Sequence, residues 1–105
     1  MQIEQYVLAD GIKAGKPAGQ ADLVLLFGAT PKIKETGLID IIKASYPKAC
    51  IFGCSTAGEI MGTHVLDDSL IATAVSFGQT RVTGSLVTNV NAGDSYKAGT
   101  DLARS

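Results

Sequence analysis

The feature that most constrains the fold of this sequence is an uninterrupted apolar run, which extends from Asp22 to Phe27 and ends at Gly28. Its apolar residues do not alternate with polar ones. The run therefore predicts a strand buried on both faces, the usual state of a central parallel strand.

The next segments complete a βαβ pattern. Apolar residues at positions 38, 41, 42 and 46 follow helical spacing and predict an amphipathic helix from Gly37 to Tyr46. Thr36 is its candidate N-cap, and Pro47 ends it at Tyr46. Residues 49–52 predict a second short buried strand, which ends at Gly53. A strand, a helix and a strand within about 30 residues form a right-handed βαβ unit with parallel strands.

The later segments favour antiparallel pairing. Leu70–Phe77 and Val82–Val90 predict two strands, which a short glycine-containing loop joins into a hairpin. Asp94 is a candidate cap for a helix that extends through Leu102. A strand from Gln2 to Leu8, followed by a loop with Gly and Lys residues, is a weaker prediction. The predicted fold class is therefore α/β, a mixed sheet with a βαβ unit followed by an antiparallel hairpin and a C-terminal helix.

Composition excludes several classes of protein. With 46% hydrophobic and 18% charged residues, the chain is too apolar for intrinsic disorder. A net charge of −1 argues against a nucleic-acid partner. The sequence contains no run of about 18 apolar residues that would span a membrane, and its N-terminus does not resemble a secretory signal. Two cysteines and one histidine are too few for a disulfide framework or a closed zinc site. We therefore expect a cytoplasmic protein.

The candidate site is the stretch from Gly53 to Ile60, which begins where the second parallel strand ends. Open α/β sheets bind ligands outside the carboxyl ends of their strands, and the first strand ends at the same edge. Glycines there allow a ligand to approach the backbone, and hydroxyl groups offer hydrogen bonds. The expected ligand-binding residues are Gly28, Thr30, Gly53, Cys54, Ser55, Thr56, Gly58 and Glu59.

The chemistry of this stretch favours an amino-acid-like ligand over a nucleotide. Gly53 and Gly58 have the spacing of a phosphate-binding loop, but Glu59 stands where that loop needs a lysine, and a carboxylate repels phosphate. Glu59 could instead hold an ammonium group, while backbone N–H groups and hydroxyls hold a carboxylate. In the alternative interpretation, the two glycines serve a tight turn and Glu59 is a solvated surface charge.

Cys54 raises the alternative of a thiol-dependent hydrolase. A nucleophilic thiolate needs a base or a cation nearby, and His64 is the only histidine. A cysteine after a buried strand is more often an inert core residue. Haem ligation by His64 is chemically feasible, but a single histidine in such a loop is usually just exposed. We expect no catalytic residue, no metal site and no resident cofactor.

The run from Gly53 to Glu59, with ADLVLLFGA before it and DDSLIATAVSF after it, resembles the N-terminal part of the FIST domain family (F-box and intracellular signal transduction proteins). The resemblance covers roughly residues 20 to 105. It implies a cytoplasmic, non-catalytic sensory domain that binds small molecules such as amino acids and acts beside signalling output domains. One subgroup of the family is associated with haem and nitric-oxide sensing.

The resemblance also bears on domain organisation. A full domain of this family is about twice as long, so residues 1–105 are expected to form a single domain that is an N-terminal fragment of a FIST-type sensory domain. Sparse charge and a bare sheet edge predict a homodimer. An assembly or interaction module is the remaining alternative function.

Overall fold

The computed structural model describes residues 1–8, 20–35, 37–88 and 90–105. The expected N-cap Thr36 and the loop expected at residues 9–19 lie outside this part of the chain. The chain contains both strands and helices, as the predicted α/β class requires. The elements are β1 (Gln2–Val7), β2 (Leu23–Gly28), α1 (Thr30–Lys34), α2 (Leu38–Ser45), β3 (Cys50–Ser55), β4 (Glu59–Met61), β5 (His64–Leu66), β6 (Leu70–Ser76), a 3₁₀ turn at Ala92–Asp94 and α3 (Ser95–Arg104).

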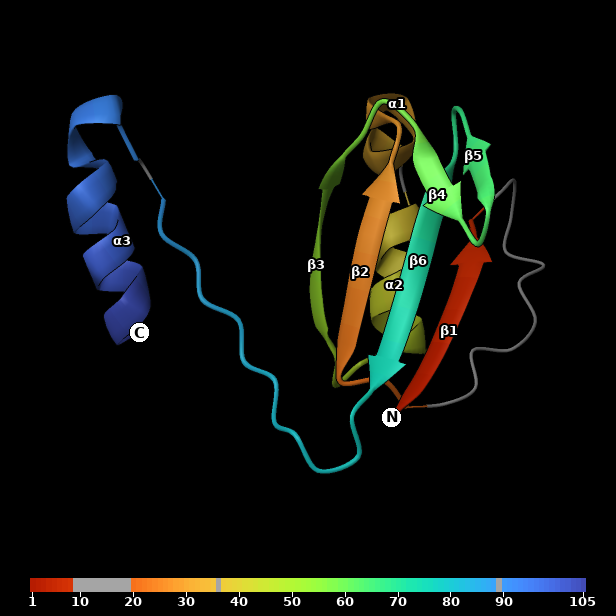
Figure 1. Ribbon diagram of the computed structural model, residues 1–105, viewed down its shortest axis with the longest axis horizontal. Coiled ribbons are helices and arrows are strands. Elements are labelled where there is room, and N and C mark those ends of the chain that lie inside the picture. Colours follow the sequence, from red (N-terminus) through yellow and green to blue (C-terminus); the bar gives the residue numbers. More distant parts are fainter. Residues whose placement is uncertain (9–19, 36, 89) are drawn as a thin grey trace.

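Four strands form a mixed sheet in the order β1-β6-β2-β3 (Figure 1). The expected βαβ unit is confirmed, because β2 and β3 pair in parallel and α2 connects them. Strand β6 pairs antiparallel with both β1 and β2. The run from Asp22 to Phe27 is therefore a central strand, as predicted. It is fully buried on one face only, because Val24 and Leu26 are buried whereas the alternate residues of β2 are half-buried.

The predicted fold class is confirmed, but the position of its hairpin differs. The antiparallel hairpin that follows the βαβ unit is formed by β4 and β5. The strand expected at Val82–Val90 as the partner of β6 is wrong over residues 82–88, which form no strand. Both edges of β6 are already paired, one with β1 and one with β2, so no edge remains for a hairpin partner.

The hydrophobic core lies between one face of the sheet and α2. Alternate residues of β2 and β6, among them Val24, Leu26 and Leu70, point to this face and pack with Leu38 and Ile42 of α2. The small side chains of β6 on the same face belong to the same cluster. Figure 1 shows α2 behind the sheet and β4 in front of it. This arrangement fixes the carboxyl ends of β2 and β3 side by side.

The second strand of the βαβ unit was expected to be buried, but none of its residues is. β3 is the edge strand of the sheet, and its Phe52 side chain is 69% exposed. Periodicity cannot separate an apolar edge strand from a central one, because it records side chains and not neighbouring strands. The backbone of β3 is therefore open along one side.

The predicted C-terminal helix is confirmed as α3, with Asp94 at its N-cap position but without a side-chain capping bond. None of the residues of α3 is buried. Figure 1 shows α3 apart from the sheet, at the end of an extended segment that follows β6.

Candidate functional site

The loops after β2 and β3 are held together by backbone hydrogen bonds. Gly28 and Ser55 are paired at the last position of the parallel register. The Thr56 amide donates to the Gly28 carbonyl oxygen at 2.9 Å, and the Ala29 amide donates to the Ser69 carbonyl oxygen at 2.9 Å. The structure thus brings together the two strand ends that the sequence predicted to be neighbours.

Glu59 is a buried carboxylate with all its partners inside the protein. Its side chain is 1% exposed, so the alternative of a solvated surface charge is wrong. Oε1 accepts a hydrogen bond from the Thr56 hydroxyl at 2.6 Å. Oε2 accepts bonds from the Ser69 hydroxyl at 2.7 Å and the Ser69 amide at 3.3 Å. The carboxylate therefore ties the start of β4 to the residues on both sides of the hairpin.

The same contacts set the protonation of this group. Hydrogen bonds from Thr56 and then Ser69 lower the pKa of Glu59 below its ordinary value, although burial acts in the opposite direction. Hydrogen bonds to the ionised form favour that form. Glu59 is thus a charged residue near neutral pH, and its charge is satisfied by three donors of the same chain.

A groove of about 410 Å³ lies at the carboxyl end of β3, between this strand and helices α1 and α2. Small-molecule sites usually have volumes of roughly 300–1,000 Å³, so the groove is large enough for a small ligand. Four expected site residues line it, namely Thr30, Gly53, Cys54 and Ser55. The other four, Gly28, Thr56, Gly58 and Glu59, are not among its lining residues.

The open edge of β3 adds backbone groups to this groove. The amides of residues 50 and 56 bond to carbonyls next to β2, and hydrogen bonds alternate along a parallel strand. The backbone N–H and C=O groups of Gly53 and Ser55 therefore face away from β2. Both residues line the groove, so a ligand there meets donors and acceptors of the main chain.

Sequence reasoning missed the helical wall of the groove. Ile33 and Lys34 come from α1, and Ile39 and Lys43 come from the region of α2. Helical spacing assigned the apolar residues of the second helix to the core. The signal that was available in the sequence is that Ile39 is apolar but lies outside the helical spacing of positions 38, 41, 42 and 46. Of those four, the structure buries Leu38, Ile42 and Tyr46 and leaves Ile41 39% exposed.

Two glycines of the candidate site are required by packing. A Cβ atom at Gly53 would collide with the backbone carbonyl of Leu26, and one at Gly28 would lie 2.8 Å from the Ser69 carbonyl oxygen. A Cβ at Gly58 would meet only Val65 Cγ1, at 3.4 Å, and Asp67 Oδ1, at 3.9 Å. Gly28 and Gly53 thus allow neighbouring strands to approach, whereas Gly58 has room for a side chain.

Cys54 is exposed, so the interpretation of this residue as an inert core cysteine is wrong. β3 is an edge strand, and its last residues are open to solvent. His64 lies on β5, where its Nδ1 atom is 3.5 Å from the Thr63 hydroxyl. In the described part of the chain, no hydrogen bond joins Cys54 to His64, so the base that a nucleophilic thiol requires is not in place.

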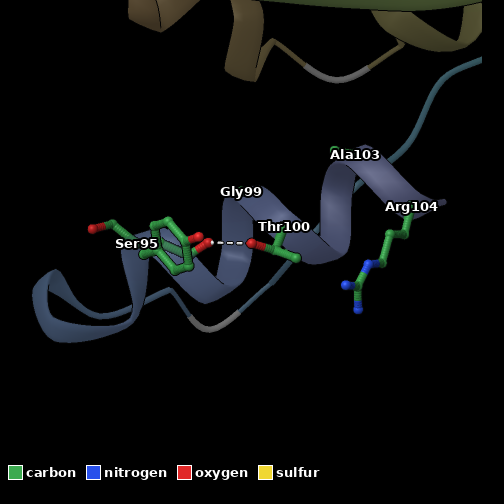
Figure 2. A pocket seen from close by; sticks show the side chains of 6 residues that line it. Ser95, Gly99, Thr100, Ala103 and Arg104 are labelled. Carbon is green, nitrogen blue, oxygen red and sulfur yellow. Dashed lines mark hydrogen bonds between the residues drawn. The ribbon is translucent and has the colours of Figure 1, made fainter.

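The described part of the chain has other hollows, which differ from the groove in how they are built. A shallow hollow along α3 is lined by Ser95, Tyr96, Gly99, Thr100, Ala103 and Arg104, and Figure 2 shows that its labelled residues all come from this one helix. Side chains of one helix cannot enclose a ligand. No three His, Cys, Asp or Glu side chains among the described residues are placed to bind one metal ion. None of the described helices has the length and hydrophobicity of a membrane-spanning segment.

Comparison with known proteins gives one family. Residues 22–105 match the FIST N domain family, which covers both parallel strands, the groove and the buried Glu59. A comparison with curated proteins found no match, and a comparison with solved structures found none either.

Proposed function

We propose that this chain, which belongs to the FIST N domain family, binds a small, amino-acid-like molecule as the sensory step of intracellular signal transduction. The family is one of signal-transduction sensory domains, and this supports a binding role without catalysis. The ligand and its site are our proposal.

The single observation that carries the proposal is the groove at the end of β3. The run from Gly53 to Glu59, which carries the family resemblance, is called the distinctive run below. Its residues Gly53, Cys54 and Ser55 line the groove together with Thr30, the first residue of α1. An apolar cavity with a few convergent polar groups is the usual form of a small-molecule site. An amino acid would place its side chain on the apolar wall. Its polar end would meet the hydroxyl of Ser55 and the free backbone groups of β3.

In this proposal Glu59 does not touch the ligand. Its carboxylate is committed to Thr56 and Ser69, so it holds the residues that follow Ser55 in place. Thr56 and Gly58 belong to the same supporting segment. The amino group of a ligand would then rely on carbonyl oxygens and hydroxyls rather than on a carboxylate.

The proposal is tested by following backbone amide signals in an NMR titration with a panel of amino acids. We expect the amides of Gly53, Cys54 and Ser55 to shift, while that of Gly62 in the β4–β5 turn stays unchanged. Ser55→Trp fills the groove and should abolish the shifts, and Thr63→Trp on the exposed turn is the matched control. Shifts that persist in Ser55→Trp would place the ligand elsewhere.

We further propose that the domain acts in the cytoplasm, as a homodimer that passes its state to signalling output domains. Unpartnered apolar side chains support the dimer. Phe52 and Ile3 of the two edge strands are 69% and 58% exposed, and Tyr96 of α3 is 89% exposed. The extended segment after β6 would allow α3 of one copy to reach the sheet of the other. Light scattering should give twice the monomer mass, and a monomeric mass at high concentration would refute the dimer.

The two alternatives have less support. A thiol hydrolase would use Cys54, which is exposed but has no base bonded to it among the described residues. An assembly module would explain the exposed apolar side chains, but it would not explain a groove lined by the distinctive run.

A further inference from the structure

The charges around the groove are all of one sign. Lys34 of α1 and Lys43 of α2 are among its lining residues, whereas no aspartate or glutamate is. The nearby carboxylate of Glu59 is buried and fully bonded within the protein. Among the described residues that line the groove, a ligand therefore has two lysines and no carboxylate beside it.

These two lysines differ from the other lysines of the described helices. Lys32 forms an ion pair with Glu35 at 3.7 Å, and Lys97 forms one with Asp101 at 2.6 Å. In the part of the chain that the structure describes, neither Lys34 nor Lys43 has an ion-pair partner. Two unpaired cations at one cavity attract an anion more strongly than isolated surface lysines do.

The floor of the groove is apolar. Five aliphatic side chains form it, namely Leu26, Ile33, Ile39, Ile51 and Leu70. Phe52 is also a lining residue, but it pairs with Leu25, and its side chain points to the face of the sheet opposite α2. An inorganic anion would leave this surface exposed to water. A ligand that has an anionic end and a hydrocarbon tail would satisfy both the lysines and the floor.

We infer that the groove recognises the carboxylate end of a short aliphatic acid and does not need an amino group. This inference rests on the proposed function, because it names the part of the amino-acid-like ligand that the same groove reads. Lys34 and Lys43 hold the carboxylate, and the hydrocarbon chain lies on Ile33, Ile39 and Ile51.

Three compounds with the same branched tail separate the possibilities: leucine, 4-methylpentanoate (leucine without its amino group) and 3-methylbutylamine (leucine without its carboxylate). Each is titrated against the full chain, and the amide shifts of Gly53, Cys54 and Ser55 are followed. We expect 4-methylpentanoate to bind at least as tightly as leucine and the amine to bind at least about tenfold more weakly, a difference of about 1.4 kcal/mol.

Variants of the lysines provide the second readout. Lys34→Gln and Lys43→Gln should each weaken binding of 4-methylpentanoate about two- to fivefold, the scale of a partly solvated ion pair. Lys32→Gln, on the same helix but outside the groove, is the matched control and should leave the affinity unchanged. The double variant Lys34→Glu/Lys43→Glu should reverse the preference and bind the amine better than the acid.

The possible failures are distinguishable. If leucine shifts the groove amides and 4-methylpentanoate does not, the amino group is required, so this inference is wrong while the proposed function stands. The same holds if the lysine variants bind the acid as well as the unmodified protein does. If none of the three compounds shifts these amides at about 20 mM, where even millimolar affinities are visible, the groove is not the ligand site and both proposals fail.

Discussion

The substitution Glu59→Ala should destabilise the fold by about 3–4 kcal/mol, because it removes the acceptor of three hydrogen bonds from a buried position. Two of those bonds come from hydroxyls and one from the Ser69 amide. A hydrogen bond to a charged group contributes roughly 1.5–3 kcal/mol. The net loss of stability is smaller than the sum of the three hydrogen bonds, because the carboxylate no longer has to be desolvated and because the hydroxyls can rotate to other partners. The Ser69 amide cannot, and it remains a buried donor without a partner.

Glu59→Gln separates the charge from the hydrogen bonds. The amide side chain has almost the same shape, and its NH₂ group can donate to the oxygen of Thr56 while its carbonyl accepts from Ser69. Neutral hydrogen bonds are about half as strong as charge-assisted ones, so we expect a loss of about 1–2 kcal/mol. Urea unfolding followed by far-ultraviolet circular dichroism measures both variants, with an unchanged m-value as the condition for comparing them.

The pH dependence gives an independent check. The folded-state pKa of Glu59 is lowered relative to its pKa in the unfolded chain, which is about 4.3 for glutamate. Its stabilising contribution is therefore fully present above that value and is lost as the pH falls through the folded-state pKa. The stability difference between the unmodified protein and Glu59→Gln should shrink below about pH 4.5. A difference that stays constant from pH 7 to low pH, or a loss under about 1 kcal/mol for Glu59→Ala, would refute the reasoning.

Three further predictions concern the same edge of the sheet. Gly53→Ala should destabilise the fold by at least about 2 kcal/mol, because the new Cβ collides with the Leu26 carbonyl. Gly58→Ala is the control and should change stability by less than about 0.5 kcal/mol. Equal unfolding midpoints for the two variants would contradict this prediction. Cys54 should react with iodoacetamide about as fast as a free model thiol, because it is exposed and unactivated, and a far faster rate would favour the hydrolase. Thr56→Ala should lower the free energy of unfolding by about 1.5–3 kcal/mol, the scale of the Thr56 hydrogen bond to the Glu59 carboxylate. Ser55→Ala should leave stability unchanged and weaken ligand binding. If Ser55→Ala proves the less stable of the two variants in urea, the roles of these residues are reversed.

Local patterns predicted the parts of the fold that local patterns determine. Three local patterns are enough to specify the βαβ unit. They are the apolar run at Asp22–Phe27, the helical spacing at positions 38–46 and the second apolar run at residues 49–52. The partner of β6 could not be found in this way. Strand β1 pairs with β6 in a register that joins Gln2 to Ser76, and such a distant pairing leaves no local signal. Proximity in sequence favoured Val82–Val90 instead.

The candidate site was predicted in position more than in detail. The rule that ligands bind at the carboxyl ends of parallel strands pointed to the edge of the sheet at which the groove lies, and four of the expected residues line that groove. Lys34 and Lys43 were not identified, because a sequence does not show which face of a helix meets a strand end. The burial of Glu59 was not visible either, since its partner Ser69 lies ten residues away, beyond a hairpin.

The distinctive run divides into two parts with different tasks, and the division falls between adjacent residues. Cys54 and Ser55 are at the end of an edge strand, so they reach the groove. The Thr56 amide bonds to Gly28 and its hydroxyl bonds to Glu59, which in turn holds Ser69 at the start of β6. One backbone segment therefore carries residues that line the groove, and the next anchors that segment to the two central strands. Because the anchor is a buried carboxylate with three donors from the same chain, the fold itself sets the position of Ser55. For the proposed ligand, a groove held in this way would reduce the conformational entropy lost on binding, because the groove would not first have to be assembled.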